Sequence, residues 1–167
     1  MTTEPKKEFL EAEPYVAIRQ KVSMAEIPTV LPPLISEVFV WMAKQKIEQN
    51  GAAFFRYLSM DENSNLVVDV GVPTKAKVAG DNRIISSVFP EGEYAALTFT
   101  GDYKNLRQAH MLLEEWIKQN GYKERSVPDD GRLVGCRVEF YISDPGEEPD
   151  PEKWVTEVCV LVEKVQV

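Results

Sequence analysis

The sequence contains little cysteine, little histidine and fewer basic than acidic residues. It has two cysteines and one histidine among 167 residues, and 19 Lys and Arg against 27 Asp and Glu give a net charge of −8. Cys136 and Cys159 are too few for a disulfide framework and lack zinc-site spacing, so we expect buried free thiols and no metal. The acidic balance argues against direct nucleic-acid binding, because affinity for phosphates requires a basic patch.

Long apolar runs and a leader segment are also missing. No window approaches the roughly 18 uninterrupted apolar residues that a membrane span requires. The first residues include lysines but no apolar segment with a small-residue cleavage site, so we expect a cytoplasmic protein that makes no membrane contact. With 44% hydrophobic and 10% aromatic residues, the chain has enough material for a core, and we expect a single domain over residues 1–167.

The sequence repeats itself. Segments around Tyr15 and Tyr94 are alike and 79 residues apart, and aromatic strands around Tyr57 and Tyr141 are 84 residues apart. Each copy is typical of the order strand, helix, strand, strand. Two such copies favour an α+β fold of tandem βαββ repeats with pseudo-two-fold symmetry, antiparallel sheets with helices on one face, and a ligand cleft between the repeats.

Local signals set the expected boundaries. Repeat one covers about residues 9–74 and repeat two about residues 83–163. The first helix is expected over residues 32–50 and ends before Gly51, and the second begins after Asp102 and ends before Gly121, with each glycine as a C-terminal cap. The polar residues 122–132 are expected to form a surface loop.

The last hairpin carries the candidate chemistry. Glu139 and Tyr141 share one face of their strand because side chains alternate. We expect the apolar faces of both strands to meet the helices, so that Glu157 joins Glu139 and Tyr141 on the other face. A carboxylate among aromatic rings attracts a cation, and each ring face adds about 0.5–2 kcal/mol. An ordinary solvated sheet face is the alternative interpretation.

Six segments resemble the GyrI-like small-molecule-binding family, which also supplies the effector-binding domain of bacterial multidrug-responsive transcription activators. In order along the chain, they are residues 54–57, 68–73, 90–95, 101–106, 139–145 and 154–158. The resemblance covers essentially residues 10–163. It implies two βαββ repeats and a cleft with an acidic floor and aromatic walls that accepts hydrophobic, often cationic, compounds.

The resemblance also implies roles for particular residues. Glu157 matches the floor carboxylate and Tyr141 a wall residue. The further predicted ligand-binding residues are Trp41, Tyr57, Phe55 and Met111. Core packing is the alternative for Trp41 and Met111. Asp69 matches a position that is often acidic in the family, and a hydrogen-bonding or solvated strand residue is its favoured interpretation.

These features favour a binding protein over an enzyme. No helix-turn-helix pattern precedes Phe9, so we expect a stand-alone member that needs no cofactor and serves in sensing, sequestration or detoxification. Relatives imply two alternatives: a hydrolase of small cyclopropanoid electrophiles that uses Glu157 and Tyr141, and a protein-interaction module of the gyrase-inhibitor type. His110, the one histidine, is expected to be a satisfied or exposed helix residue.

Overall fold

The computed structural model describes residues 1–166, which form two compact units. The N-terminal repeat unit comprises residues 12–90, and the C-terminal repeat unit comprises residues 1–11 and 91–166. Each unit is an antiparallel sheet with helices packed against it, which confirms the predicted α+β class.

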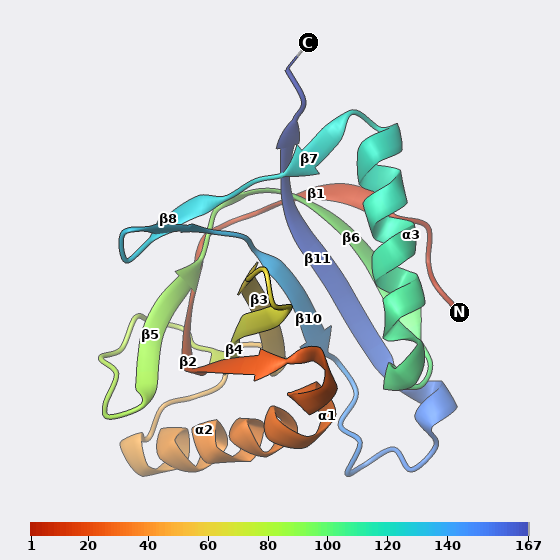
Figure 1. Cartoon of the computed structure of the whole chain (residues 1–167). Coiled ribbons are helices and arrows are strands. Elements are labelled where there is room, and N and C mark those ends of the chain that lie inside the picture. Colours follow the sequence, from red (N-terminus) through yellow and green to blue (C-terminus); the bar gives the residue numbers. More distant parts are fainter. Residues whose placement is uncertain (167) are drawn as a thin grey trace. The chain divides into compact units, whose positions relative to one another are not determined.

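The N-terminal repeat unit has four strands in the order β3-β4-β2-β5. Helix α2 contacts β4 and β2, and Figure 1 shows it in orange beside these strands. The buried residues of this helix recur one turn apart, at Leu34, Val38 and Met42, so a single stripe faces the sheet. The elements are β2 (Glu13–Ser23), η1 (Met24–Glu26), α1 (Ile27–Val30), α2 (Pro32–Gln45), β3 (Phe54–Met60), β4 (Asn65–Pro73) and β5 (Ile84–Phe89).

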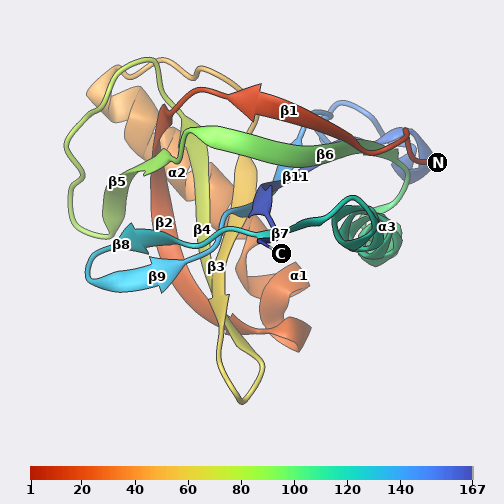
Figure 2. The same ribbon diagram turned by 90° about the horizontal axis from the view of Figure 1, so that it is seen from above.

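The C-terminal repeat unit has strands in the order β1-β6-β11-β10, with β7 paired to β11. Figure 2 shows β1 running along β6, and the separate hairpin of β8 and β9. The elements are β1 (Lys6–Leu10), β6 (Gly92–Thr100), η2 (Tyr103–Asn105), α3 (Leu106–Gln119), β7 (Tyr122–Glu124), β8 (Val127–Asp129), β9 (Arg132–Val134), β10 (Arg137–Tyr141), η3 (Pro151–Lys153) and β11 (Val155–Lys164).

Helix α3 buries its apolar stripe on the sheet of its own unit. Leu106, Ala109, Leu113 and Ile117 form one core cluster, as their spacing predicts. The strand residues that complete this cluster come from β6 and β11 and identify the face that meets the helix: Ala95, Leu97, Phe99, Val158, Val160 and Val162.

Equivalent strands pair in the same register within each of the two units. Tyr57 lies opposite Val68 in the first unit, and Tyr141 lies opposite Thr156 in the second. The offsets of 84 and 88 residues between these pairs are those of the predicted repeat. The sequence repeat is therefore a structural repeat at the level of individual strand pairs.

Two predicted boundaries are wrong. Helix α2 ends at Gln45, not near Gly51, because Lys46 adopts the left-handed conformation and its backbone N–H bonds to carbonyls of the last turn. Residues 122–132 are not a plain loop, since they contain β7, which pairs with β11, and β8. The second helix does end as expected, with Gly121 at a positive φ of 78°.

The edges of the units also differ from the predicted repeat limits. Strand β5 pairs with β2 in the N-terminal unit, although residue 83 was expected to open the second repeat. Strand β1 pairs with β6 in the C-terminal unit. The predicted two-fold relation and the cleft between the repeats stay predictions.

Among the described residues, no helix has the length and apolar character needed to cross a membrane.

Candidate functional site

Glu139 is a buried carboxylate on β10 of the C-terminal repeat unit. Its side chain is 7% exposed, and both of its oxygens are hydrogen-bonded. The hydroxyl of Tyr141 donates to Oε1 at 2.6 Å, and Nε2 of His110 on α3 lies 2.6 Å from Oε2. A strand and the helix that covers it thus hold this carboxylate between them.

The pairing register explains how an acidic residue faces the helix. Glu139 lies opposite Val158, and residues directly opposite in an antiparallel pair point to the same face. Val158 belongs to the cluster under α3, so Glu139 and Tyr141 face α3 as well. This overturns the prediction that the Glu139 face points away from the helices.

Arg137 extends the hydrogen-bonded chain. Its Nη1 lies 3.0 Å from Nδ1 of His110, and its Nη2 lies 3.3 Å from Oε1 of Glu124 on β7. A guanidinium can only donate, so Nδ1 accepts and the ring proton of His110 lies on Nε2, which donates to Glu139. The chain of donors runs from Arg137 through a neutral imidazole to the carboxylate.

Aromatic rings adjoin this carboxylate. The ring of Tyr103 is edge-to-face with Tyr141 at 5.4 Å and tilted against Trp154 at 4.6 Å. Burial, followed by the negative charges of Asp144 and Glu139, raises the pKa of Tyr103 to about 12. The row of Tyr141, Tyr103 and Trp154 therefore presents neutral rings next to a negative charge.

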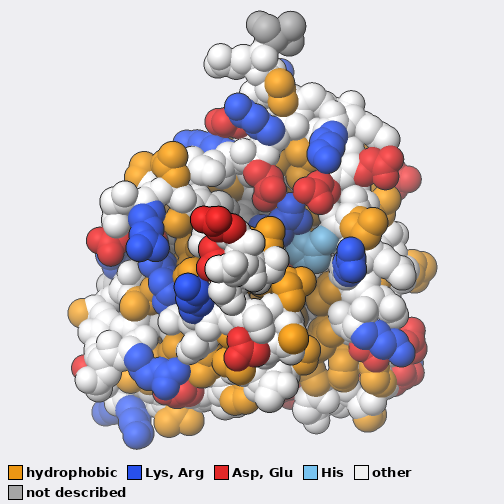
Figure 3. Space-filling view, in the orientation of Figure 1, with side chains coloured by type: hydrophobic (Ala, Val, Ile, Leu, Met, Phe, Trp, Pro, Cys, Tyr) orange, Lys and Arg blue, Asp and Glu red, His pale blue; other side chains and the backbone are white. Residues whose placement is uncertain are grey.

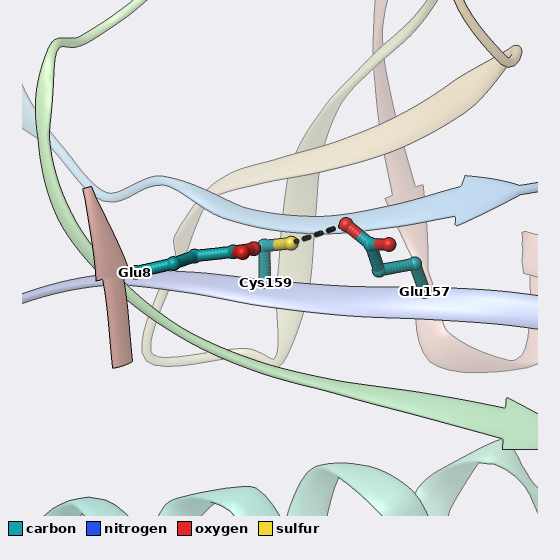
Figure 4. A group of neighbouring side chains, drawn as sticks. All are labelled: Glu8, Glu157 and Cys159. Carbon is teal, nitrogen blue, oxygen red and sulfur yellow. Dashed lines mark hydrogen bonds between the residues drawn. The ribbon is translucent and has the colours of Figure 1, made fainter. Parts of the chain in front are cut away.

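Glu157, the predicted floor residue, lies on the opposite face of the sheet. It pairs with Phe140, so it does not share a face with Tyr141, and the predicted partition of the hairpin is wrong. Figure 4 shows its carboxylate with Cys159 and Glu8, and Sγ of Cys159 donates to Oε1 at 3.3 Å. Burial, and next the charge of Glu157, raises the pKa of the Cys159 thiol well above its usual range, so the thiol keeps this proton.

Asp69 occupies the position in the first repeat that Glu157 occupies in the second. Arg19 and Arg56 flank Asp69 on the neighbouring strands, where Thr98 and Phe140 flank Glu157. Asp69 is fully buried and accepts from Arg19 Nε at 2.8 Å and Nη2 at 3.0 Å. It also accepts from the Tyr15 hydroxyl at 2.5 Å. Asp69 is therefore a hydrogen-bonding strand residue and not a solvated one.

The other predicted ligand residues are spread over both units. Phe55 and Tyr57 share a face of β3, with Phe55 buried and Tyr57 partly buried. Trp41 on α2 is partly buried, and its Nε1 is shielded without a hydrogen-bond partner among the described residues. Met111 on α3 is 59% exposed, so it does not pack in the core.

Sequence reasoning placed Glu139 near the site but missed its burial and missed His110 as its partner. The signal was the Glu-x-Tyr spacing within one strand, which puts both side chains on one face. The face that meets the helix depends on the hairpin register, and the loop of residues 145–153 hides that register from the sequence.

Charge on the visible surface is mixed. In Figure 3, acidic and basic side chains alternate with apolar ones, and no single-sign patch dominates this face. The candidate site is thus distinguished by buried charge next to aromatic rings and not by a charged surface.

Comparisons with known proteins identify the fold. A chain of the EcmrR–DNA complex matches at 21% identity with a TM-score of 0.79, over 98% of this chain and 58% of that chain. The EcmrR C-terminal domain matches at 20% identity with a TM-score of 0.73, over 96% and 98% of the two chains. SAV2435 bound to tetraphenylphosphonium matches at 14% identity with a TM-score of 0.60, over 96% and 94%.

This chain thus spans a little over half of the EcmrR chain in that complex. A comparison with curated proteins found no match. The model of the GyrI-like small molecule binding domain matches residues 3–163. The chain therefore belongs to the GyrI-like small-molecule-binding family.

Proposed function

We propose that this protein binds lipophilic organic cations, with Glu139 as the acidic group and Tyr141, Tyr103 and Trp154 as the aromatic surface. The observation that carries the proposal is a buried carboxylate whose oxygens accept from a phenol and an imidazole beside a row of rings. Sensing, sequestration or detoxification of such compounds is the role that we infer.

The physical reason is that a cation gains an electrostatic attraction to Glu139 in addition to its apolar contacts with the rings. A carboxylate removed from water gains from a partner of opposite charge, and a delocalised organic cation loses little hydration on binding. Each ring that it covers adds about 0.5–2 kcal/mol by cation–π attraction. A neutral compound of the same shape would gain the apolar contacts alone.

Two comparisons support the choice of ligand class. The family description specifies small-molecule binding, and SAV2435, which shares the fold, was solved with tetraphenylphosphonium. The site for this chain remains our proposal. Trp41, Tyr57, Phe55 and Met111 stay predicted ligand contacts, and a protein partner stays a prediction as well.

Calorimetry with two Glu-to-Gln variants tests the proposal. Wild-type protein is titrated with tetraphenylphosphonium and with neutral triphenylphosphine oxide. Removing one member of a buried charge pair costs about 2–5 kcal/mol, so Glu139→Gln should weaken cation binding by about 30-fold or more. Binding of the neutral compound should change much less, because the rings remain.

Glu157→Gln is the matched control, since it makes the same change on the neighbouring strand and on the other face of the sheet. It should leave both affinities unaltered. If Glu157→Gln weakens cation binding and Glu139→Gln does not, Glu157 is the floor carboxylate, as the family resemblance implies, and our assignment of Glu139 is wrong. Equal affinity of all three proteins for the cation would remove both carboxylates from the site.

Hydrolysis is the second candidate function, and one observation favours it. The Tyr141 hydroxyl and the Glu139 carboxylate lie 2.6 Å apart, a spacing suited to a proton donor and a general base that act on one bound molecule. Incubation with cyclopropanoid electrophiles and mass detection of a product with added water tests this function. Turnover lost in Glu139→Gln would support it, and unchanged electrophile would exclude it for those compounds.

A further inference from the structure

His110 separates a positive group from a negative one. Arg137 donates to its Nδ1, and its Nε2–H donates to Glu139, so the imidazole in this network carries no charge. Glu139 is therefore held by hydrogen bonds from His110 and Tyr141, and the guanidinium of Arg137 contacts the far side of the ring. The neutral imidazole thus lies between the guanidinium of Arg137 and the carboxylate of Glu139, so the negative charge of Glu139 can attract a cationic ligand.

A second proton on the imidazole would change that order. Protonated Nδ1 would face the N–H groups of Arg137, and two donors cannot share a hydrogen bond. Arg137 has another partner in place, because its Nη2 lies 3.3 Å from Glu124. The imidazolium would then form a full ion pair with Glu139 across the same 2.6 Å contact.

The other charged groups around His110 come from several elements of its unit. On β6 and β11, Glu93 and Lys164 lie on the same face as the apolar residues under α3, together with the hydroxyl of Thr156. Glu93 forms an ion pair with Lys7 of β1 at 2.9 Å. On the helix itself, Arg107 and Glu114 lie about one turn to either side. The titratable and charged groups on the other elements that pack against the helix are Arg137, Glu139 and Tyr141 of β10, Tyr122 and Glu124 of β7, and Tyr103 and Lys104 of η2.

We propose that His110 is a specificity-determining residue of this site. In its neutral form it leaves the charge of Glu139 to a cationic ligand, and in its protonated form it takes that charge itself. The inference rests on the proposed function, because it assumes that Glu139 is the group that attracts the cation. It adds that the protonated imidazole of His110 and an organic cation compete for the charge of Glu139.

The first test is the pH dependence of affinity. Because the protonated ring would take the charge of Glu139, wild-type affinity for tetraphenylphosphonium should fall about threefold or more over a series of titrations from about pH 8 down to about pH 5. Affinity for triphenylphosphine oxide should not change. In His110→Gln, the amide still donates to Glu139 but cannot gain a proton, so cation affinity should be equal at every pH of the series.

The second test needs no variant. The chain has one histidine, so the one imidazole Hε1 resonance in the proton NMR spectrum reports on His110. Since coupling between two bound species is reciprocal, saturating tetraphenylphosphonium should shift the titration of this resonance to lower pH. If His110→Gln does not fold, this measurement alone tests whether protonation of His110 and cation binding are coupled.

The possible outcomes are distinct. If the cation binds at pH 8, and its affinity and the imidazole titration are independent of each other, His110 has no such role and the proposed function stands. A pH profile that is identical in wild type and His110→Gln leads to the same conclusion. If tetraphenylphosphonium binds at no pH of the series, the proposed function fails and this inference fails with it.

Discussion

Asp69 and Glu139 are both buried carboxylates on β-strands, but their partners differ. Asp69 forms a two-pronged ion pair with Arg19 and accepts from Tyr15, which in turn accepts from Arg56 at 3.0 Å. Glu139 accepts from Tyr141 and from His110. The first arrangement pairs a carboxylate with an arginine, whereas these hydrogen bonds to Glu139 come from a phenol and an imidazole.

Asp69→Asn tests the structural role of the first carboxylate. The change leaves arginines beside a neutral amide, and breaking a buried pair in this way costs about 3–5 kcal/mol. Because the Arg19 side chain is 31% exposed, we expect a loss near the lower limit, about 3 kcal/mol, in urea unfolding. Glu157→Gln should stay within about 0.5 kcal/mol of wild type, and a similar loss in both variants would contradict this interpretation.

Helix ends show how local signals compete. Gly121 ends α3 as its position predicts, but Gly51 does not end α2. The helix stops at Gln45, and Lys46 takes the left-handed conformation at a φ of 57°. This conformation costs a non-glycine residue about 1–2 kcal/mol, and the hydrogen bonds from the Lys46 N–H to carbonyls of the last turn offset part of that cost.

Lys46→Gly should therefore stabilise the protein. Glycine removes the cost of the left-handed conformation but loses about 0.5–1 kcal/mol of backbone entropy on folding, so the net gain is about 0.5 kcal/mol. For a chain of this size, that gain raises Tm by about 1–2 °C in scanning calorimetry. Lys44→Gly, inside the same helix, should lower Tm instead, and two changes of the same sign would refute the cap assignment.

At the scale of the whole molecule, burial raises the pKa of one thiol and two phenols, which lose a proton at high pH. Burial raises the pKa of Cys159 from its usual 9.0, that of Tyr15 from its usual 10.0, and that of Tyr103 to about 12. For such groups, the folded protein keeps protons that the unfolded chain releases. Their contribution to stability is complete below about pH 9 and is lost as the pH rises through the folded values.

The free energy of unfolding should thus fall steadily from pH 9 to pH 12. Urea unfolding at intervals across this range measures it, and Tyr103→Phe should show a smaller decline above pH 10, because it lacks one of the three groups. An unfolding free energy that stays constant over this range would show that these groups titrate alike in the folded and unfolded chains.

The class of fold, the repeat, and the pairing of an acidic residue with aromatic ones can all be predicted from the sequence. Periodicity and the offsets between tyrosines are local properties of the chain, so the strands, the helices and the Glu-x-Tyr pair followed from them. Which carboxylate lies buried with the aromatic rings depends on tertiary packing and cannot be predicted from the sequence. That depends on the pairing of β10 with β11, because a shift of one residue moves every side chain to the other face. The long loop between these strands leaves the register to packing, and packing placed Glu139, not Glu157, against His110.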